Sequence, residues 1–204
     1  MADSVDPRVV DPLVVGRVIG DVVDMFAPRV GMSVYYGAKH VTNGCTVKPS
    51  AAAAPPSVHI PGRSPEEHYT LLIYLLEHDS YPLKNHKMCR CLNYLSTRSQ
   101  IRPDLLTNHL YVRIYIYIYI WNMCMHLYIA GKEIVPYMGP RPPVGIHRYV
   151  MVLFQQKEPL TDVEPPASRA HFSTRSFSGH HDLGLPVATV YFNAQKEPRV
   201  KKRS

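Results

Sequence analysis

The apolar residues at the start of the chain recur at helical spacing. In residues 11–23 they lie at i, i+1, i+4, i+5, i+8 and i+9, from Val14 to Val23, which places them on one helical face. Asp11 is suited to cap this segment, and Pro12 suits the first helical position. The pattern predicts a short N-terminal helix or turn that lies on a sheet.

From residue 32 onward the apolar period changes to that of strands. The run at 148–154 is apolar on both faces, which is typical of a central strand. Asn43-Gly44 lies between β-branched residues and is a strong signal for a hairpin turn. Five runs are predicted to be strands: 32–36, 58–60, 69–73, 148–154 and 185–192.

Proline content and a second helix complete the predicted fold class. The chain has 19 prolines against 11 glycines, which favours short strands joined by stiff loops because proline stops helices. Residues 172–181 are predicted to form one short helix. We therefore expect a mainly β fold, a β-sandwich with short peripheral helices.

Residues 74–130 differ in kind from the rest. They hold three of the four cysteines and the one tryptophan, and residues 114–120 alternate between isoleucine and tyrosine. The alternation suits a strand by propensity, but an uninterrupted AT dinucleotide repeat encodes the same pattern. We hypothesise a retained intron or a gene-model error, with a genuine insertion as the alternative. Asn122 and His126 interrupt residues 114–130, so we expect no membrane span there.

These patterns predict one β domain with an interrupted middle. Residues 1–73 and 131–195 form its two parts, residues 74–130 are a poorly ordered insertion or replacement, and residues 196–204 are a basic tail. The tail accounts for +4 of the formal net charge of +7. We interpret it as a solubilising end, because no aromatic-interleaved basic patch or zinc finger indicates direct nucleic-acid binding.

Motifs for catalysis, metals and cofactors are missing. The chain contains no G-x-S-x-G, H-E-x-x-H, G-x-G-x-x-G or P-loop pattern, so we expect no enzyme activity. Cys89, Cys91, Cys124 and His126 would supply four zinc ligands by residue type. One residue separates the members of each pair, however, and this spacing is too short for a zinc site. We expect no metal and no cofactor.

The candidate chemistry lies in residues 133–150, where a proline-rich loop runs into a strand that begins with histidine. Gly139 and Gly145 permit close backbone approach, and the prolines make the loop stiff. His147 is placed to donate a hydrogen bond to an anion or a phosphate ester. The alternative is a buried histidine that is satisfied by backbone groups.

These residues carry a family resemblance. G-I-H-R-Y-V at 145–150, with P-Y-x-G-P-x-P-P before it, resembles the ligand-loop signature of the phosphatidylethanolamine-binding protein family. The resemblance covers residues 1–73 and 131–204. Residues 163–166 and 196–198 are more similar to the plant Mother-of-FT branch than to the florigen branch. Further matching motifs lie at 11–26, 41–45, 172–177 and 183–198.

The resemblance implies a large central β-sheet in a sandwich and a small anion pocket. That pocket binds phosphate-type or phospholipid head groups, without established turnover. Plant members are non-enzymatic signalling regulators of flowering and seed germination. They act with 14-3-3 proteins and basic-leucine-zipper transcription factors, in the cytoplasm and nucleus. By position, the pocket residues here are Gly139, Pro142, Pro143, His147 and Tyr149.

The departures from the family pattern leave a second hypothesis open. The family's D-P-D-x-P loop and R-E-W-x-H-W strand are absent, so we expect weak ligand binding and open sheet edges. Glu66 and Gln155 stand where florigen-type members offer arginines to 14-3-3 proteins, which makes that contact doubtful. The chain is then either a regulatory binding module or a non-functional mis-spliced or pseudogene product that cannot bind ligand.

Overall fold

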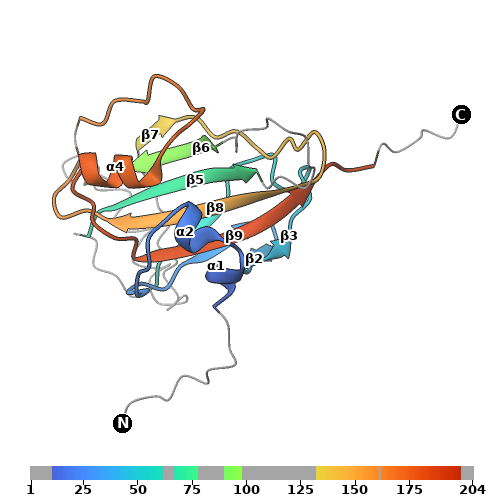
Figure 1. Cartoon of the computed structure of the whole chain (residues 1–204), viewed down its shortest axis with the longest axis horizontal. Helices are drawn as coiled ribbons and strands as arrows, with labels where there is room; N and C mark the ends of the chain where they lie inside the picture. Colours follow the sequence, from blue (N-terminus) through green and yellow to red (C-terminus); the bar gives the residue numbers. More distant parts are fainter. Residues whose placement is uncertain (1–10, 62–66, 78–89, 98–131, 161, 199–204) are drawn as a thin grey trace, which may run out of the picture.

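The computed structural model describes residues 11–61, 67–77, 90–97, 132–160 and 162–198. Within these residues the chain forms a six-stranded and a three-stranded sheet with short helices beside them (Figure 1). The strand order is β3-β9-β8-β5-β6-β7 in the larger sheet and β2-β1-β4 in the smaller one. The predicted fold class, a mainly β sandwich with peripheral helices, is confirmed.

The strands are short in the smaller sheet and long at the centre of the larger one. All neighbours pair antiparallel except β3 and β9, which are parallel. The bounds are β1 Ser33–Tyr36, β2 Lys39–Val41, β3 Cys45–Thr46, β4 Ser57–His59, β5 Tyr69–Glu77, β6 Arg90–Thr97, β7 Lys132–Val135, β8 Ile146–Gln155 and β9 Ala188–Gln195.

Strand β8 lies at the centre of the larger sheet, between β5 and β9. Its side chains alternate between two separate cores. Tyr149, Met151 and Leu153 face the core between the two sheets. Val150 and Phe154 face a second core beneath the helices. The prediction of a central strand that is apolar on both faces is therefore confirmed.

The N-terminal segment forms two single helical turns, α1 (Pro12–Val15) and α2 (Val18–Asp21). The Asp11 carboxylate accepts a hydrogen bond from the Leu13 N–H at 2.8 Å, as expected for a cap. Arg17 adopts a left-handed conformation with φ 54° and separates the two turns. Because this break rotates the chain, Val14 and Val15 are exposed, contrary to the predicted continuous apolar face.

The hairpin predicted at Asn43-Gly44 is not formed. A turn closed by the Cys45 N–H and the Thr42 carbonyl carries the chain from β2 in the smaller sheet to β3 in the larger one. The Asn43 side chain accepts a hydrogen bond from the Tyr191 N–H on β9 at 3.1 Å. Asn43 and Gly44 therefore bond to Tyr191 on β9, and the strands on either side of them join different sheets.

The second predicted helix is confirmed as α4 (Thr174–His180). Ser173 caps it by accepting a hydrogen bond from the Ser176 N–H at 3.2 Å. The Arg175 guanidinium reaches back to the N-terminal segment and bonds Asp24 and the carbonyls of Gly20 and Val23. The segments at the two ends of the domain therefore cover the same face of the larger sheet.

Two segments of the 74–130 stretch belong to the larger sheet. Strand β5 continues past residue 73 to Glu77, and β6 pairs with both β5 and β7. The expected open edge beside β5 is therefore covered by β6. Residues 78–89 and 98–130 lie outside the described residues, and the domain division stays a prediction.

Among the described residues, no helix is long and apolar enough to cross a membrane. The 114–130 run lies outside them.

Candidate functional site

The proline-rich loop joins β7 to β8 and contacts the segment that follows β3. The Tyr137 hydroxyl donates to the Ala52 carbonyl oxygen at 2.8 Å. The same hydroxyl lies 3.0 Å from that of Tyr36 on β1. Since the one Tyr137 proton goes to Ala52, the Tyr36 hydroxyl is the donor of the second bond. The loop thus ties the 48–53 segment to the smaller sheet.

Gly139 is packed against the same segment. A Cβ atom at this position would lie 2.8 Å from the Ala52 carbonyl oxygen and 3.3 Å from the Ala53 Cα. Contacts that short are not tolerated by a carbon atom, so the backbone approach requires glycine. The predicted close backbone approach at Gly139 is therefore present. It is an approach to the backbone of Ala52 and Ala53.

His147 is the second residue of β8 and is buried, with 7% of its surface exposed. Its Nε2 lies 2.9 Å from the Val144 carbonyl oxygen, which fixes the ring orientation. In register, His147 stands between Glu77 on β5 and Ala194 on β9. The backbone contact agrees with the alternative of a structural histidine, but it also leaves the ring in a defined position at one end of the sandwich.

Tyr149 lies two residues further along the same face of β8. Its ring stacks on Phe192 with centroids 5.3 Å apart and an interplanar angle of 14°. Tyr36 meets the same Phe192 ring edge-on at 5.5 Å. The structure therefore brings Tyr36, Tyr137 and Tyr149 into one cluster around Phe192. Sequence reasoning selected Tyr149 and missed Tyr36, which comes from a distant strand and carries no motif.

The two remaining predicted residues differ in exposure. Pro142 is buried and Pro143 is exposed. Both belong to the loop between Tyr137 and His147, so the loop brings Gly139, Pro142 and His147 to one end of the sandwich. Pro143 faces solvent there.

Tyr36 and Tyr137 stay neutral at physiological pH. Burial is the main cause that raises the pKa of Tyr36 far above its ordinary value, and the neighbouring Tyr137 and Tyr149 add to the shift. Burial also raises the pKa of Tyr137. These hydroxyls therefore act as hydrogen-bonding groups and do not serve as bases near pH 7.

In the described part of the chain, no group of three or more histidine, cysteine, aspartate or glutamate side chains could hold a metal ion. Cys45 is a free thiol of intermediate burial. Cys89 and Cys124, two of the four residues considered as zinc ligands, lie outside the described residues.

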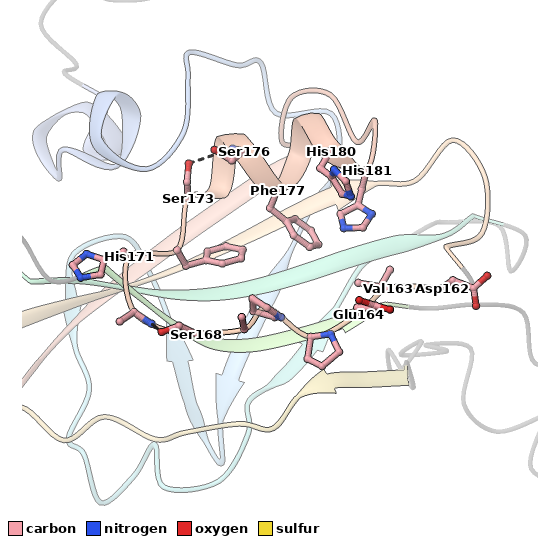
Figure 2. A pocket seen from close by; sticks show the side chains of 15 residues that line it. Asp162, Val163, Glu164, Ser168, His171, Ser173, Ser176, Phe177, His180 and His181 are labelled. Atoms are coloured by element: carbon pink, nitrogen blue, oxygen red, sulfur yellow. Dashed lines mark hydrogen bonds between the residues drawn. The ribbon is translucent and has the colours of Figure 1, made fainter.

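A hollow lies away from His147, between α4 and the 162–173 segment. It has a volume of about 980 Å³, and Figure 2 shows Phe177 and His181 directed from α4 toward this segment. Sequence reasoning did not find it, although the 163–166 motif and the 172–181 helix both line it. We call it the α4 groove. Its lining residues are Asp162, Val163, Glu164, Pro165, Pro166, Ala167, Ser168, Ala170, His171, Phe172, Ser173, Ser176, Phe177, His180 and His181.

Comparison with known proteins links the chain to plant proteins. The family described as "Phosphatidylethanolamine-binding protein" matches residues 118–192. Protein MOTHER of FT and TFL1 homolog 2 of Oryza sativa subsp. japonica is 42% identical over 198 residues, covering 96% of this chain and 99% of that protein. Protein TERMINAL FLOWER 1 of Arabidopsis thaliana is 37% identical, covering 98% of this chain and 99% of that protein.

Solved structures share the fold at low sequence identity. The carboxypeptidase Y inhibitor, solved in complex with its cognate proteinase, has a TM-score of 0.65 at 16% identity, covering 91% of this chain and 94% of that one. The phosphatidylethanolamine-binding protein from Plasmodium vivax has a TM-score of 0.61 at 16% identity, covering 91% of this chain and 96% of that one.

The family match begins at residue 118, inside the stretch that the motifs left without resemblance. The similarity therefore extends beyond the ranges 1–73 and 131–204. The retained-intron hypothesis concerns the transcript and stays a prediction.

Proposed function

This chain belongs to the phosphatidylethanolamine-binding protein family, and on that premise we propose that it is a non-enzymatic signalling regulator of the Mother-of-FT type. Its role would be the control of seed germination and flowering. The observation that carries the proposal is the 42% identity to the rice relative across 96% of the chain. The relatives' names, Protein TERMINAL FLOWER 1 among them, support the flowering part.

The proposed partners follow the same premise. A basic-leucine-zipper transcription factor is the expected partner, which requires the protein in the nucleus as well as the cytoplasm. A 14-3-3 contact is a weaker part of the proposal, because Gln155 supplies a neutral amide at the end of β8 where the family resemblance implies an arginine. Glu66 lies outside the described residues. We propose no direct contact with nucleic acid.

The proposed ligand is a phosphate-type anion or a phospholipid head group at the His147 end of the sandwich. Three features support this position. The Val144 carbonyl holds the His147 ring, and the proline-rich loop packs against Ala52. His147 is also the second residue of β8, close to the end of the sheet. Because the Val144 carbonyl already contacts Nε2, Nδ1 is the ring atom proposed to contact a phosphate oxygen. We expect weak affinity, because the family's D-P-D-x-P loop and R-E-W-x-H-W strand are absent from the sequence.

A ligand titration tests the pocket. Inorganic phosphate and O-phosphoethanolamine are added to the isotope-labelled protein, and amide shifts are followed by NMR. Saturable shifts in residues 136–149 are expected, and His147→Ala should lose them. His40→Ala is the matched control, since His40 is exposed on β2. Equal titration curves for the two variants would contradict the pocket assignment.

A plant assay tests the regulatory role separately. The coding sequence is expressed in Arabidopsis thaliana that lacks TERMINAL FLOWER 1, and flowering time and germination are scored. Delayed flowering or altered germination is expected relative to a Val152→Asp variant, which places a carboxylate in the core beneath the helices. Accumulation of the unaltered protein without any change in either trait would refute the proposal and favour the non-functional product.

A further inference from the structure

The α4 groove is separate from the His147 end of the molecule. His147 lies at the start of β8, whereas α4 lies toward the other end of that strand (Figure 1). Val163 and Phe172 of the groove belong to the core beneath the helices, while Tyr149 beside His147 belongs to the core between the sheets. The two sites therefore lie on opposite faces of the larger sheet.

The groove differs in charge from the rest of the chain. The protein has 23 lysines and arginines and a formal net charge of +7. None of the fifteen described residues that line the groove is a lysine or an arginine. Its charged side chains are the carboxylates of Asp162 and Glu164, both in exposed positions. An acidic hollow on a basic protein attracts cations and repels phosphates.

Aromatic rings line the groove beside these carboxylates. Phe177 lies 5.6 Å from Phe172 and 4.5 Å from His181, centroid to centroid. Figure 2 shows the Phe177 and His181 rings directed toward the segment that carries Glu164. Pro165 and Pro166 add apolar surface on that side. Aromatic faces beside a carboxylate are the surroundings that bind guanidinium and ammonium groups, through cation–π and charge-assisted contacts.

We propose that the α4 groove binds a basic peptide segment, an extended stretch of a partner protein that carries arginine or lysine. A guanidinium of this segment would lie between Glu164 and the Phe177 ring. The volume of about 980 Å³ is at the upper end of small-molecule sites. Because most of the lining residues are exposed, an extended chain fits the groove better than an enclosed metabolite does.

One of the three histidines in the groove, His181, makes this binding sensitive to pH. His171, His180 and His181 line the groove together with Asp162 and Glu164. Burial is the main cause that lowers the pKa of His181, and the neighbouring His180 lowers it further. At pH 7.5 His181 is therefore neutral. As the pH falls through its lowered pKa, the His181 ring takes up a proton and opposes a cationic ligand. Lys157 and Arg175 are engaged elsewhere, with Asp182 and Asp24.

Fluorescence anisotropy with the full-length protein tests the proposal. The probe is fluorescein-labelled Ala-Arg-Pro-Lys-Arg-Ala-amide, and the reference probe has glutamine in place of each basic residue. Glu164→Gln is the test variant. Glu158→Gln is the matched control, because Glu158 is also an exposed carboxylate near this segment but does not line the groove. Both variants lose the same charge at the surface, so neither should affect folding.

The proposal predicts saturable binding of the basic probe and much weaker binding of the glutamine probe. Glu164→Gln should weaken the basic probe about fivefold, the effect of one partly exposed ion pair, and Glu158→Gln should leave it unchanged. Binding should also weaken as the pH falls below 6.5 and through the lowered pKa of His181. The absence of binding at millimolar protein, equal binding of both probes, or equal losses in both variants would overturn the proposal. Occupancy of the groove by a second copy, detected as self-association that Glu164→Gln abolishes, would overturn it as well.

Discussion

Replacing Gly139 by alanine should displace the proline-rich loop, because Gly139 and Tyr137 both contact the Ala52 carbonyl oxygen. The added Cβ would lie 2.8 Å from the Ala52 carbonyl oxygen, whereas ordinary contact begins at 3.4 Å. The loop or the 48–53 segment must therefore move by about 0.6 Å. The same oxygen accepts the hydrogen bond from the Tyr137 hydroxyl at 2.8 Å, so this shift stretches that bond toward its limit.

The expected loss of stability follows from these two effects. Overpacking against backbone costs about 1–3 kcal/mol, and a weakened hydrogen bond contributes up to about 1 kcal/mol of that range. Unfolding in urea, followed by far-UV circular dichroism, measures the free energy of unfolding. We expect Gly139→Ala to lower it by about 2 kcal/mol and Tyr137→Phe by about 1 kcal/mol.

The matched control is a second glycine with open space around it. A Cβ at Gly179 in α4 would meet nothing within 4 Å, and its backbone is not in the left-handed region. Gly179→Ala should therefore be neutral or stabilise by up to about 1 kcal/mol through helix propensity. The reasoning is refuted if Gly139→Ala unfolds at the same urea concentration as the unaltered protein. It is also refuted if Gly139→Ala and Tyr137→Phe add fully in the double variant, since they should share one contact.

Three further predictions concern contacts outside the loop. Gln156→Leu should lower the free energy of unfolding by about 2–3 kcal/mol in urea unfolding, because the buried amide donates to the Tyr69 carbonyl and the Thr70 hydroxyl; a loss below about 0.5 kcal/mol would contradict this. Arg175→Ala should cost about 1 kcal/mol in thermal unfolding, since its guanidinium joins α4 to the N-terminal segment, whereas Lys157→Ala, which removes an exposed ion pair, should change little. The hydrogen bond from the Ser50 N–H lowers the pKa of Glu197 below 4.5; this contact is therefore present above pH 4.5 and is lost as the pH falls through the lower folded-state pKa. The Ser50 amide resonance should titrate below pH 4.5 and cease to do so in Glu197→Gln.

What the sequence determined by itself is the set of local elements. The apolar run of β8, the cap at Asp11 and the short helix after Ser173 depend on neighbours within a few residues, so their patterns predicted them correctly. The family could also be identified from short motifs, because residues 145–150 carry a specific signature. The role of Gly139, Pro142 and His147 in ligand binding stays a prediction from those motifs.

The tertiary structure alone decided how distant segments pair. Asn43-Gly44 looks like a hairpin locally, but its side chain bonds β9, so the flanking strands join different sheets. Tyr36 joins Tyr137 across 101 positions of the chain, and no local pattern encodes that distance. The α4 groove likewise forms only when the 162–173 segment folds against α4. Pairing of this kind depends on the burial of side chains from remote segments, which a pattern of neighbouring residues does not specify.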